Sequence, residues 1–262
     1  MTKLIDKLWN WGHLEGSHNQ ITGLNCSMSP EQYAEEYGIK NAFIVSYRGN
    51  IQPPYNEIAK RLSSLNQIKW SVLGDASTPE PDAELGFTED ILDVLEDAPN
   101  ITGGVVDDFF VRPVRAERFP PEVLKKIKKA LNDKGLDFWC VVYNHQLDED
   151  LEKYKGCFDG ITFWIWECDN IVHLDEYMPK VFSLANGNPV MCGVYVWDFS
   201  TAEGKPMDIN LFDRQVSKCF DMLKSKEIEG VIFCSSTLGD AELETNKLLK
   251  KYIAEQGDIE IE

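Results

Sequence analysis

Short apolar runs alternate with amphipathic segments along all 262 residues of the chain. Each run is rich in Val, Ile, Phe, Trp or Tyr, and most are nearly continuous in apolar character. That pattern is typical of parallel strands that are covered on both faces. It predicts eight strands, at residues 7–13, 41–47, 68–75, 101–108, 137–144, 159–167, 190–198 and 230–235.

The segments between these runs have the features of helices. Ser29 and Pro30 open the first as an N-cap residue followed by proline in the first turn. Segment 121–134 repeats apolar residues at helical spacing on one face and carries lysines on the other. The other predicted helices lie at 53–66, 88–97, 148–154, 175–186, 211–226 and 240–256.

Eight strands that alternate with eight helices predict an α/β fold, a single (β/α)8 TIM barrel domain over residues 1–262. The alternative is a doubly wound open sheet. The regular count disfavours it, as does the lack of a G-x-G-x-x-G after the first strand.

The loops expected at the two ends of the barrel differ in length. Helix-to-strand connections are tight, whereas strand-to-helix loops are long at 14–28, 76–87, 109–120 and 199–209. In such barrels the strand-to-helix loops form the catalytic face.

The chain is strongly acidic, with a formal net charge of −18. This charge argues against nucleic acid and anionic membranes as partners, and against multiply phosphorylated substrates. No segment approaches the roughly 18 apolar residues of a membrane span. Neutral polar ligands carry no such penalty, so we expect a small-molecule or oligosaccharide substrate. The oligomeric state is not readable from the sequence.

The seven cysteines are odd in number, and no two are spaced as C-x-x-C. Cys140, Cys192 and Cys234 lie inside apolar runs. We interpret them as small buried hydrophobic residues in a reducing compartment, not as a disulfide framework or a zinc site. The first residues lack the apolar stretch of a signal peptide. Both features favour a cytoplasmic protein.

Polar and aromatic side chains end all eight predicted strands. In a barrel, these ends meet at one mouth, so we expect the side chains to converge there. The ends carry His13, Tyr47 with Arg48, Asp75, Asp107 with Asp108, Tyr143 with Asn144 and His145, Trp164 with Trp166 and Glu167, Tyr195 with Trp197 and Asp198, and Ser235 with Ser236.

Two adjacent aspartates, Asp107 and Asp108, end the apolar run 101–106. Two ionised carboxylates that lie close together repel each other, so one tends to keep its proton to higher pH. One acid and one base from identical side chains suit acid–base hydrolysis. The plainer alternative is that one aspartate caps the next loop and the other is solvated. Neighbours on a strand face opposite sides, which leaves open which carboxyl enters the barrel mouth.

Trp166 and Trp197, beside Glu167 and Asp198, are placed to form a sugar platform. The indole ring covers the C–H face of a sugar while polar groups bind its hydroxyls. The alternative is that these tryptophans plug the top of the barrel. We expect substrate contacts from His13, Tyr47, Tyr143, Asn144, Trp166, Tyr195, Trp197 and Asp198.

The sequence Gly-Gly-Val-Val-Asp-Asp-Phe at 103–109 resembles the adjacent aspartate pair of glycoside hydrolase family 84, the β-N-acetylglucosaminidases. It resembles the acidic fourth-strand motif of chitinase-like barrels more loosely. The resemblance implies that Asp107 orients the substrate's acetamido group and that Asp108 is the general acid. It also implies hydrogen-bonding roles for Tyr143 and Asn144. The segments 9–13 (Trp-Asn-Trp-Gly-His) and 16–19 (Gly-Ser-His-Asn) look like a signature of an uncharacterised family of presumed hydrolases.

Three functions are consistent with this sequence. The first is a glycosidase in which Asp108 acts with Asp107, Glu167 or Asp198, without metal or cofactor. The second is a metal-dependent isomerase, aldolase or lyase on the same barrel. It is disfavoured because no H-x-H or H-E-x-x-H occurs. The third is a non-catalytic sugar-binding barrel. The metal ligands available to the second are His13, Asp107, His145, Glu167 and Asp198.

Arg112, Arg115 and Arg118 follow the aspartate pair in one loop. The simplest interpretation is that they pair with the abundant acidic residues. The functional alternative is recognition of an anionic substituent, such as a uronate, on the substrate.

Overall fold

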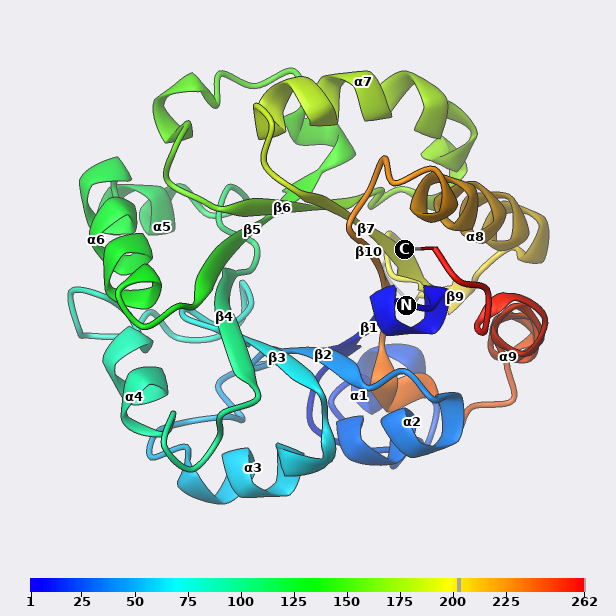
Figure 1. Ribbon diagram of the computed structural model, residues 1–262, viewed down its shortest axis with the longest axis horizontal. Coiled ribbons are helices and arrows are strands. Elements are labelled where there is room, and N and C mark those ends of the chain that lie inside the picture. Colours follow the sequence, from blue (N-terminus) through cyan, green and yellow to red (C-terminus); the bar gives the residue numbers. More distant parts are fainter. Residues whose placement is uncertain (202–203, 262) are drawn as a thin grey trace.

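A computed structural model describes residues 1–201 and 204–261, and the predicted loop 199–209 therefore lies partly outside the described residues. Eight parallel strands close into a barrel in the order β1-β10-β7-β6-β5-β4-β3-β2 (Figure 1). The predicted (β/α)8 barrel is confirmed. The strands are β1 (Leu8–Gly12), β2 (Asn41–Ile44), β3 (Gln67–Ser71), β4 (Ile101–Val106), β5 (Asp137–Tyr143), β6 (Gly160–Trp164), β7 (Val190–Tyr195) and β10 (Gly230–Cys234).

Helices surround the barrel (Figure 1). The long strand-to-helix loops add two short helices, α1 (Asn19–Thr22) and α5 (Pro113–Arg118). Ser29 caps α2 as predicted, because its side chain accepts a hydrogen bond from the Gln32 backbone N–H. The others are α2 (Pro30–Tyr37), α3 (Asn56–Arg61), α4 (Thr88–Asp93), α6 (Pro121–Asn132), α7 (Leu174–Ala185), α8 (Ile209–Lys224) and α9 (Glu244–Gln256).

Two element predictions are wrong. Residues 148–154 form no α-helix, and only the 3₁₀ turns η3 (Asn144–Gln146) and η4 (Glu152–Tyr154) occupy the connection from β5 to β6. The acidic sequence 148–152 supplies too few apolar positions for a buried helix face. The predicted strand 190–198 is also split. β7 ends at Tyr195, and β8 (Trp197–Asp198) pairs with β9 (Lys205–Pro206) in a separate antiparallel hairpin.

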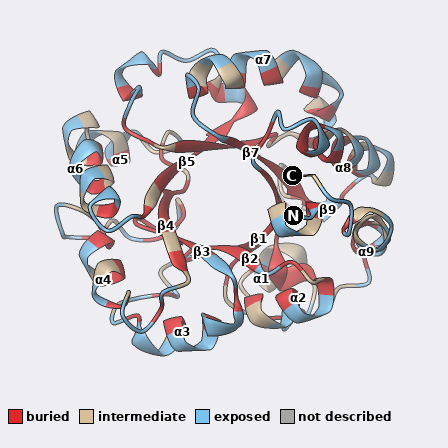
Figure 2. Cartoon of the chain, viewed as in Figure 1, coloured by how far each residue is buried: buried red, intermediate tan, exposed pale blue. Residues whose placement is uncertain are grey.

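The apolar residues form separate layers inside and outside the barrel. Figure 2 shows the strands buried and the helices exposed on their outer sides. Outside, the strands pack against the buried faces of the helices. Inside, Trp9, Trp11, Trp139 and Trp164 form one cluster with smaller side chains. Four buried indoles fill the interior, and the strand-end residue Trp164 is one of them.

An ion pair between a buried lysine and a more exposed aspartate lies at the opposite end of the barrel from the strand-to-helix loops. Lys69 is 4% exposed, and its Nζ lies 2.5 Å from Asp137 Oδ1. The same ammonium lies 5.7 Å and 5.9 Å from the ring centroids of Trp9 and Trp139. Indoles and this ammonium close the barrel floor, which leaves the other end for a site.

In the described part of the chain, no helix is long and apolar enough to cross a membrane.

Glycines in neighbouring strands make room for the indoles. A Cβ atom on Gly193 would lie 2.0 Å from Trp164 Cδ2, and one on Gly160 would lie 2.5 Å from Trp139 Cε3. Both separations are far below van der Waals contact, so a side chain at either position would displace a tryptophan. The two indoles therefore fit only because glycine, which has no side chain, occupies the facing position in the neighbouring strand.

We expect Gly193→Ala to lower the free energy of unfolding by about 1–3 kcal/mol, because the new methyl group overpacks the Trp164 ring. Urea titration followed by tryptophan fluorescence measures this loss. Ser183→Ala, on the exposed side of α7, is the control and should change stability by no more than about 0.5 kcal/mol. Equal midpoints for the two variants would contradict the packing argument.

Candidate active site

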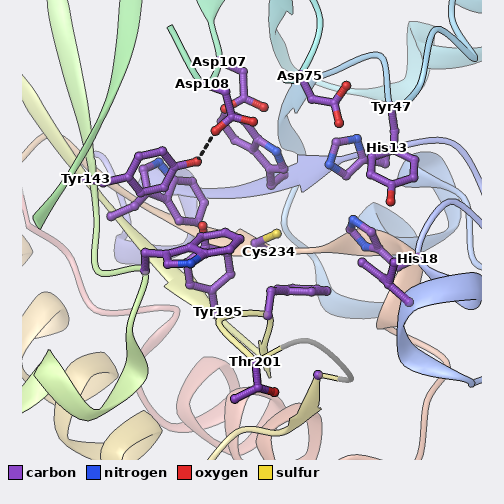
Figure 3. Close-up of a pocket in the computed structure, with 16 residues that line it drawn as sticks. His13, His18, Tyr47, Asp75, Asp107, Asp108, Tyr143, Tyr195, Thr201 and Cys234 are labelled. Carbon is purple, nitrogen blue, oxygen red and sulfur yellow. Dashed lines mark hydrogen bonds between the residues drawn. The ribbon is translucent and has the colours of Figure 1, made fainter. Parts of the chain in front are cut away.

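A pocket of about 290 Å³ opens at the carboxyl ends of the barrel strands. Three carboxyl groups line it, from Asp75 after β3 and from Asp107 and Asp108 after β4. Figure 3 shows Asp107 and Asp108 together on one side, with Tyr143 and the His13–Tyr47 side chains flanking them. Seven predicted site residues line this pocket: His13, Tyr47, Asp107, Asp108, Tyr143, Trp166 and Tyr195.

Both adjacent aspartates reach the pocket because the strand ends before them. β4 ends at Val106, and Asp108 has a φ of 49°, in the left-handed region. This conformation breaks the alternation that would send neighbouring side chains to opposite faces. Aspartate is among the few residues other than glycine that adopt it readily. The local backbone therefore answers the question that the sequence left open.

The two carboxyl groups have different partners. Asp108 Oδ1 accepts a hydrogen bond from the Tyr143 hydroxyl at 2.7 Å, and Oδ2 accepts one from the Ala76 backbone N–H at 3.0 Å. Burial raises the pKa of Asp108, but these two hydrogen bonds oppose the increase. Asp107 is 5% exposed, and burial, followed by the Asp108 charge, raises its pKa well above the usual range. Asp107 is therefore the carboxyl group that keeps its proton to higher pH.

Arg115 connects the backbones that carry these acids. It is 0% exposed and donates to the carbonyl oxygens of Gly74 at 3.1 Å, Asp75 at 3.0 Å and Asp107 at 2.7 Å. Its Nε also lies 3.2 Å from Glu80 Oε1. The guanidinium thus joins the ends of β3 and β4, and its charge partly offsets the increase in the pKa of Asp107.

None of the three loop arginines lines the pocket. Arg112 donates to the Ala76 carbonyl at 2.7 Å and pairs with Glu80 at 3.2 Å. Arg118 lies 4.0 Å from Asp82. All three arginines pair with acidic residues, as the simplest interpretation predicted. They therefore do not supply the positive charge that a uronate site in this pocket would need.

Asp75, one of the strand-end residues expected at the barrel mouth, belongs to the pocket wall. Its Oδ1 accepts from the Thr78 hydroxyl at 2.7 Å, and its Oδ2 accepts from the Ser77 hydroxyl at 2.6 Å. The Arg48 backbone N–H donates to Oδ1 at 3.3 Å. These bonds fix the loop after β3, so Asp75 orders the wall beside the catalytic candidates.

Aromatic rings continue the wall away from the acids. Tyr143 and Tyr195 both contact Trp166 edge to face, with centroid distances of 5.8 Å and 5.9 Å. Phe199 extends the row, 5.8 Å from Tyr195. Trp166 is only half-buried, so part of its indole is free to contact a ligand. A flat aromatic wall beside carboxyl groups suits a sugar ring.

Glu167 and Asn144 do not line the pocket, so the expected convergence of all eight strand ends is only partly correct. Asn144 donates to Glu167 Oε2 at 3.0 Å and accepts from the Trp166 backbone N–H at 2.9 Å. It therefore holds the end of β6 in place. Glu167 is half-exposed beside it, because the chain turns away from the barrel after Trp166.

Trp197 and Asp198 are also outside the pocket, because the chain leaves the barrel after β7 and enters the β8–β9 hairpin. Trp197 is buried in the outer core, and not at the barrel mouth. Asp198 accepts from the Ser200 hydroxyl at 2.6 Å and lies 3.6 Å from Lys205 Nζ. Burial alone would raise its pKa, but hydrogen bonds from Ser200 and Cys168 and the Lys205 charge lower it overall.

Some pocket residues were not among the predicted catalytic residues or substrate contacts. Within the described residues they include His18, which the Gly-Ser-His-Asn segment contained without revealing its position. The other such pocket residues are Trp11, Ile21, Asp75, Trp164, Phe199, Thr201, Gly204 and Cys234.

No group of three or more His, Cys, Asp or Glu side chains in the described ranges is arranged to hold a metal ion.

No protein-family model matches the chain, and no curated protein matches it. Its fold is similar to that of a chitinase from Chromobacterium violaceum ATCC 12472, at 11% identity over 94% of this chain and 98% of the other (TM-score 0.55). It is also similar to a GH113 β-mannanase from Alicyclobacillus acidocaldarius, at 11% identity over 97% and 98% (TM-score 0.59).

A tryptophan synthase complex from Pyrococcus furiosus matches as well, at 12% identity over 99% of this chain and 100% of the other (TM-score 0.50). At such identities the likeness shows the (β/α)8 fold alone, which hosts many chemistries. Glycoside hydrolases recur among these neighbours, whereas family 84 itself is not among the matches described here. Function must therefore be argued from the pocket.

Replacing the buried acid should stabilise the protein. Because the pKa of Asp107 is higher in the folded chain than in the unfolded chain, the stability present at low pH is lost as the pH rises through the folded pKa. We expect Asp107→Asn to raise the melting temperature at pH 8 by about 2–4 °C, which is about 1 kcal/mol for a domain near this size.

The same comparison at low pH tests the cause. The difference should vanish at about pH 3 and below, where most aspartate is protonated even in the unfolded chain. Asp82→Asn, at a fully exposed carboxylate, is the matched control and should reproduce the wild-type curve. A stabilisation by Asp107→Asn that is equal at both pH values would contradict an ionisation effect. Thermal scans followed by circular dichroism measure all three proteins.

Proposed function

We propose that this protein is a glycoside hydrolase that cleaves a neutral or N-acetylated sugar by acid–base chemistry between Asp107 and Asp108. One observation carries the proposal. Two adjacent carboxyl groups line one aromatic pocket at the carboxyl ends of the strands, and two donors bind Asp108 while Asp107 is buried with the higher pKa of the two. That difference favours a proton on Asp107 while Asp108 is ionised, as acid–base hydrolysis requires.

The hydrogen bonds favour Asp107 as the general acid and Asp108 as the ionised partner. Asp108 accepts from two donors, which stabilises its carboxylate, whereas burial stabilises the protonated form of Asp107. This assignment reverses the order that the resemblance to family 84 implies. The reversal is open to experiment, because acid and base variants respond differently to the leaving group.

For an N-acetylated sugar, the reaction needs no third carboxyl group. Asp108 would hold the acetamido N–H while the acetamido oxygen attacks the anomeric carbon. Asp107 would donate its proton to the departing glycosidic oxygen, so the C–O bond breaks as the new bond forms. Water then opens the cyclic intermediate, and Asp107 takes back a proton. Substrate-assisted families use this route in place of a protein nucleophile.

The pocket supports a small and uncharged sugar. Its volume of about 290 Å³ lies near the lower end for ligand sites, which suits one or two sugar units. No lysine or arginine of the described residues lines it, so an anionic substituent would meet only carboxylates. The half-buried Trp166 provides an aromatic surface for the ring.

A leaving-group series tests the acid and base roles. Aryl glycosides of N-acetylglucosamine and glucose should be compared with 4-nitrophenyl and 2,4-dinitrophenyl leaving groups. We expect Asp107→Asn to lose about 10²- to 10⁴-fold with 4-nitrophenyl and much less with dinitrophenyl, which departs without a proton. Asp108→Asn should lose activity on both. The measurement is kcat/KM for each pair.

Glu167→Gln is the matched control, because Glu167 lies outside the pocket. It should retain wild-type turnover. The reverse leaving-group pattern would restore the roles that the resemblance implies. Binding of these sugars without turnover by the wild type would favour a non-catalytic sugar-binding barrel, and activity that a chelator abolishes and a metal restores would favour the metal-dependent alternative.

The Tyr143 hydroxyl should control the pH profile. Its hydrogen bond lowers the pKa of Asp108, so Tyr143→Phe should move the acidic limb of kcat/KM to higher pH. At the wild-type midpoint we expect a loss of about tenfold, since hydrogen bonds to charged groups are worth about 1.5–3 kcal/mol. Tyr177→Phe, outside the pocket, is the control. An unmoved limb with lower activity would mean that Tyr143 acts on the substrate instead.

A further inference from the structure

A second polar cluster faces the pocket from the side opposite Tyr143. The rings of His13 and His18 meet edge to face at 4.9 Å, and Tyr47 contacts them at 5.6 Å and 5.4 Å. Figure 3 shows the three rings together, with Asp107 and Asp108 between them and Tyr143. Both histidines are at least 95% buried and line the pocket, yet the acid–base mechanism gives neither a role.

The segment that looked like a family signature builds this cluster. β1 ends at Gly12, just before His13, and the turn at Gly16 has a φ of 75°. Asn19 fixes the loop, because its side chain donates to the Cys26 carbonyl at 2.9 Å and accepts from the Cys26 N–H at 3.0 Å. His18 is thereby brought beside His13. The spacing of five residues between His13 and His18 does not by itself predict that the two rings meet, because the loop conformation decides it.

The proton on His13 has a definite position. Its Nδ1 lies 2.9 Å from the Val45 carbonyl oxygen, which can only accept, so Nδ1 must carry the hydrogen. In the neutral ring, Nε2 is then a bare acceptor. No hydrogen bond within the described residues engages this nitrogen.

His18 has the opposite arrangement. Its Nδ1 lies 2.8 Å from the Ser235 hydroxyl and 2.9 Å from the Thr237 hydroxyl, which lie 2.8 Å from each other. If Nδ1 carries no proton, both hydroxyl protons have an acceptor. One hydroxyl donates to Nδ1, and the second hydroxyl donates to the oxygen of that hydroxyl. With a protonated Nδ1, the remaining hydroxyl proton would be left to the Cys234 thiol, a weaker acceptor than the ring nitrogen. The proton of neutral His18 therefore lies on Nε2.

Burial favours the neutral form of both rings. Burial lowers the pKa of His13, against the Val45 bond and the charges of Asp75 and Asp108. Burial, followed by the neighbouring His13, lowers the pKa of His18 well below the usual range. Two rings that line the pocket, with centroids 4.9 Å apart, thus carry one acceptor nitrogen and one donor nitrogen.

We propose that His13 and His18 form a hydroxyl-recognition subsite, where a sugar hydroxyl donates to His13 Nε2 and accepts from His18 Nε2–H. The ligand class, a sugar, rests on the proposed function. A hydroxyl is the group that both donates and accepts through one atom. An ammonium only donates, and a fluorine or ether oxygen only accepts, so each satisfies half of the pair.

The tautomers can be tested without any substrate. In protein labelled with ¹⁵N at the histidine rings, long-range ¹H–¹⁵N correlation spectra report which ring nitrogen is protonated. The chain has four histidines, so His145→Gln and His173→Gln complete the assignment. We expect Nδ1–H with bare Nε2 for His13, and the reverse for His18. Identical tautomers, or a charged ring at pH 7, would overturn the proposal.

Ligand analogues test the recognition itself. Methyl N-acetyl-β-D-glucosaminide and methyl β-D-glucoside are compared with their deoxy, deoxyfluoro and amino analogues at each hydroxyl position. The signals of both Nε2 atoms should move with a parent sugar. At one position, all three replacements should weaken binding by about tenfold or more. If no parent sugar moves either signal, or if one replacement binds as well as the hydroxyl at every position, the proposal fails.

Conservative variants separate binding from fold. His18→Gln keeps a donor near the Nε2 position and should retain most affinity, whereas His18→Phe should lose about tenfold. His173→Gln, at an exposed ring outside the pocket, should bind like wild type. Equal affinity for His18→Phe and wild type would overturn the subsite. These readouts are independent of turnover, so the subsite can stand if hydrolysis fails, and hydrolysis can stand if the subsite fails.

Discussion

The buried guanidinium of Arg115 is the interaction on which the rest of the site depends. It joins the carbonyl groups at the ends of two neighbouring strands and brings the Asp75 and Asp107 backbones together. It also supplies positive charge beneath two buried carboxyl groups that would otherwise repel each other. Breaking one partner of such a buried network leaves uncompensated charge, which costs several kcal/mol. Arg115, in α5, thus supports the site without itself lining the pocket.

Much of the fold could be predicted from the sequence because parallel strands and their covering helices have different periods. The continuous apolar runs revealed the eight strands, and the capped amphipathic segments revealed most helices. The prediction failed at 148–154, where acidic residues replace the apolar stripe, and at 197–198, where Trp197 continues the apolar run but pairs, with Asp198, in a hairpin outside the barrel. The first pattern was too weak to predict a helix correctly, and the second did not reveal where the barrel strand ends.

The candidate site was predictable only where a strand end leads directly into the mouth. Asp107, Tyr143 and Tyr195 follow that rule. Glu167 and Asp198 do not, because the chain turns outward one or two residues before them. His18 was hidden for the opposite reason, since a loop carries it back over the barrel. The placement of Asp108 depended on one left-handed backbone angle, which no periodicity reveals.

Among the described residues, tryptophans and the Lys69–Asp137 pair close the barrel floor, so the pocket opens at the carboxyl ends of the strands. Under the proposed function, a product would leave by the same end at which the substrate enters. A departing group and an incoming water molecule would therefore share one path, and the first must clear before the second arrives. Packing at the far end of the barrel would thus set the order of these events, through Trp9, Lys69 and Trp139, which do not line the pocket.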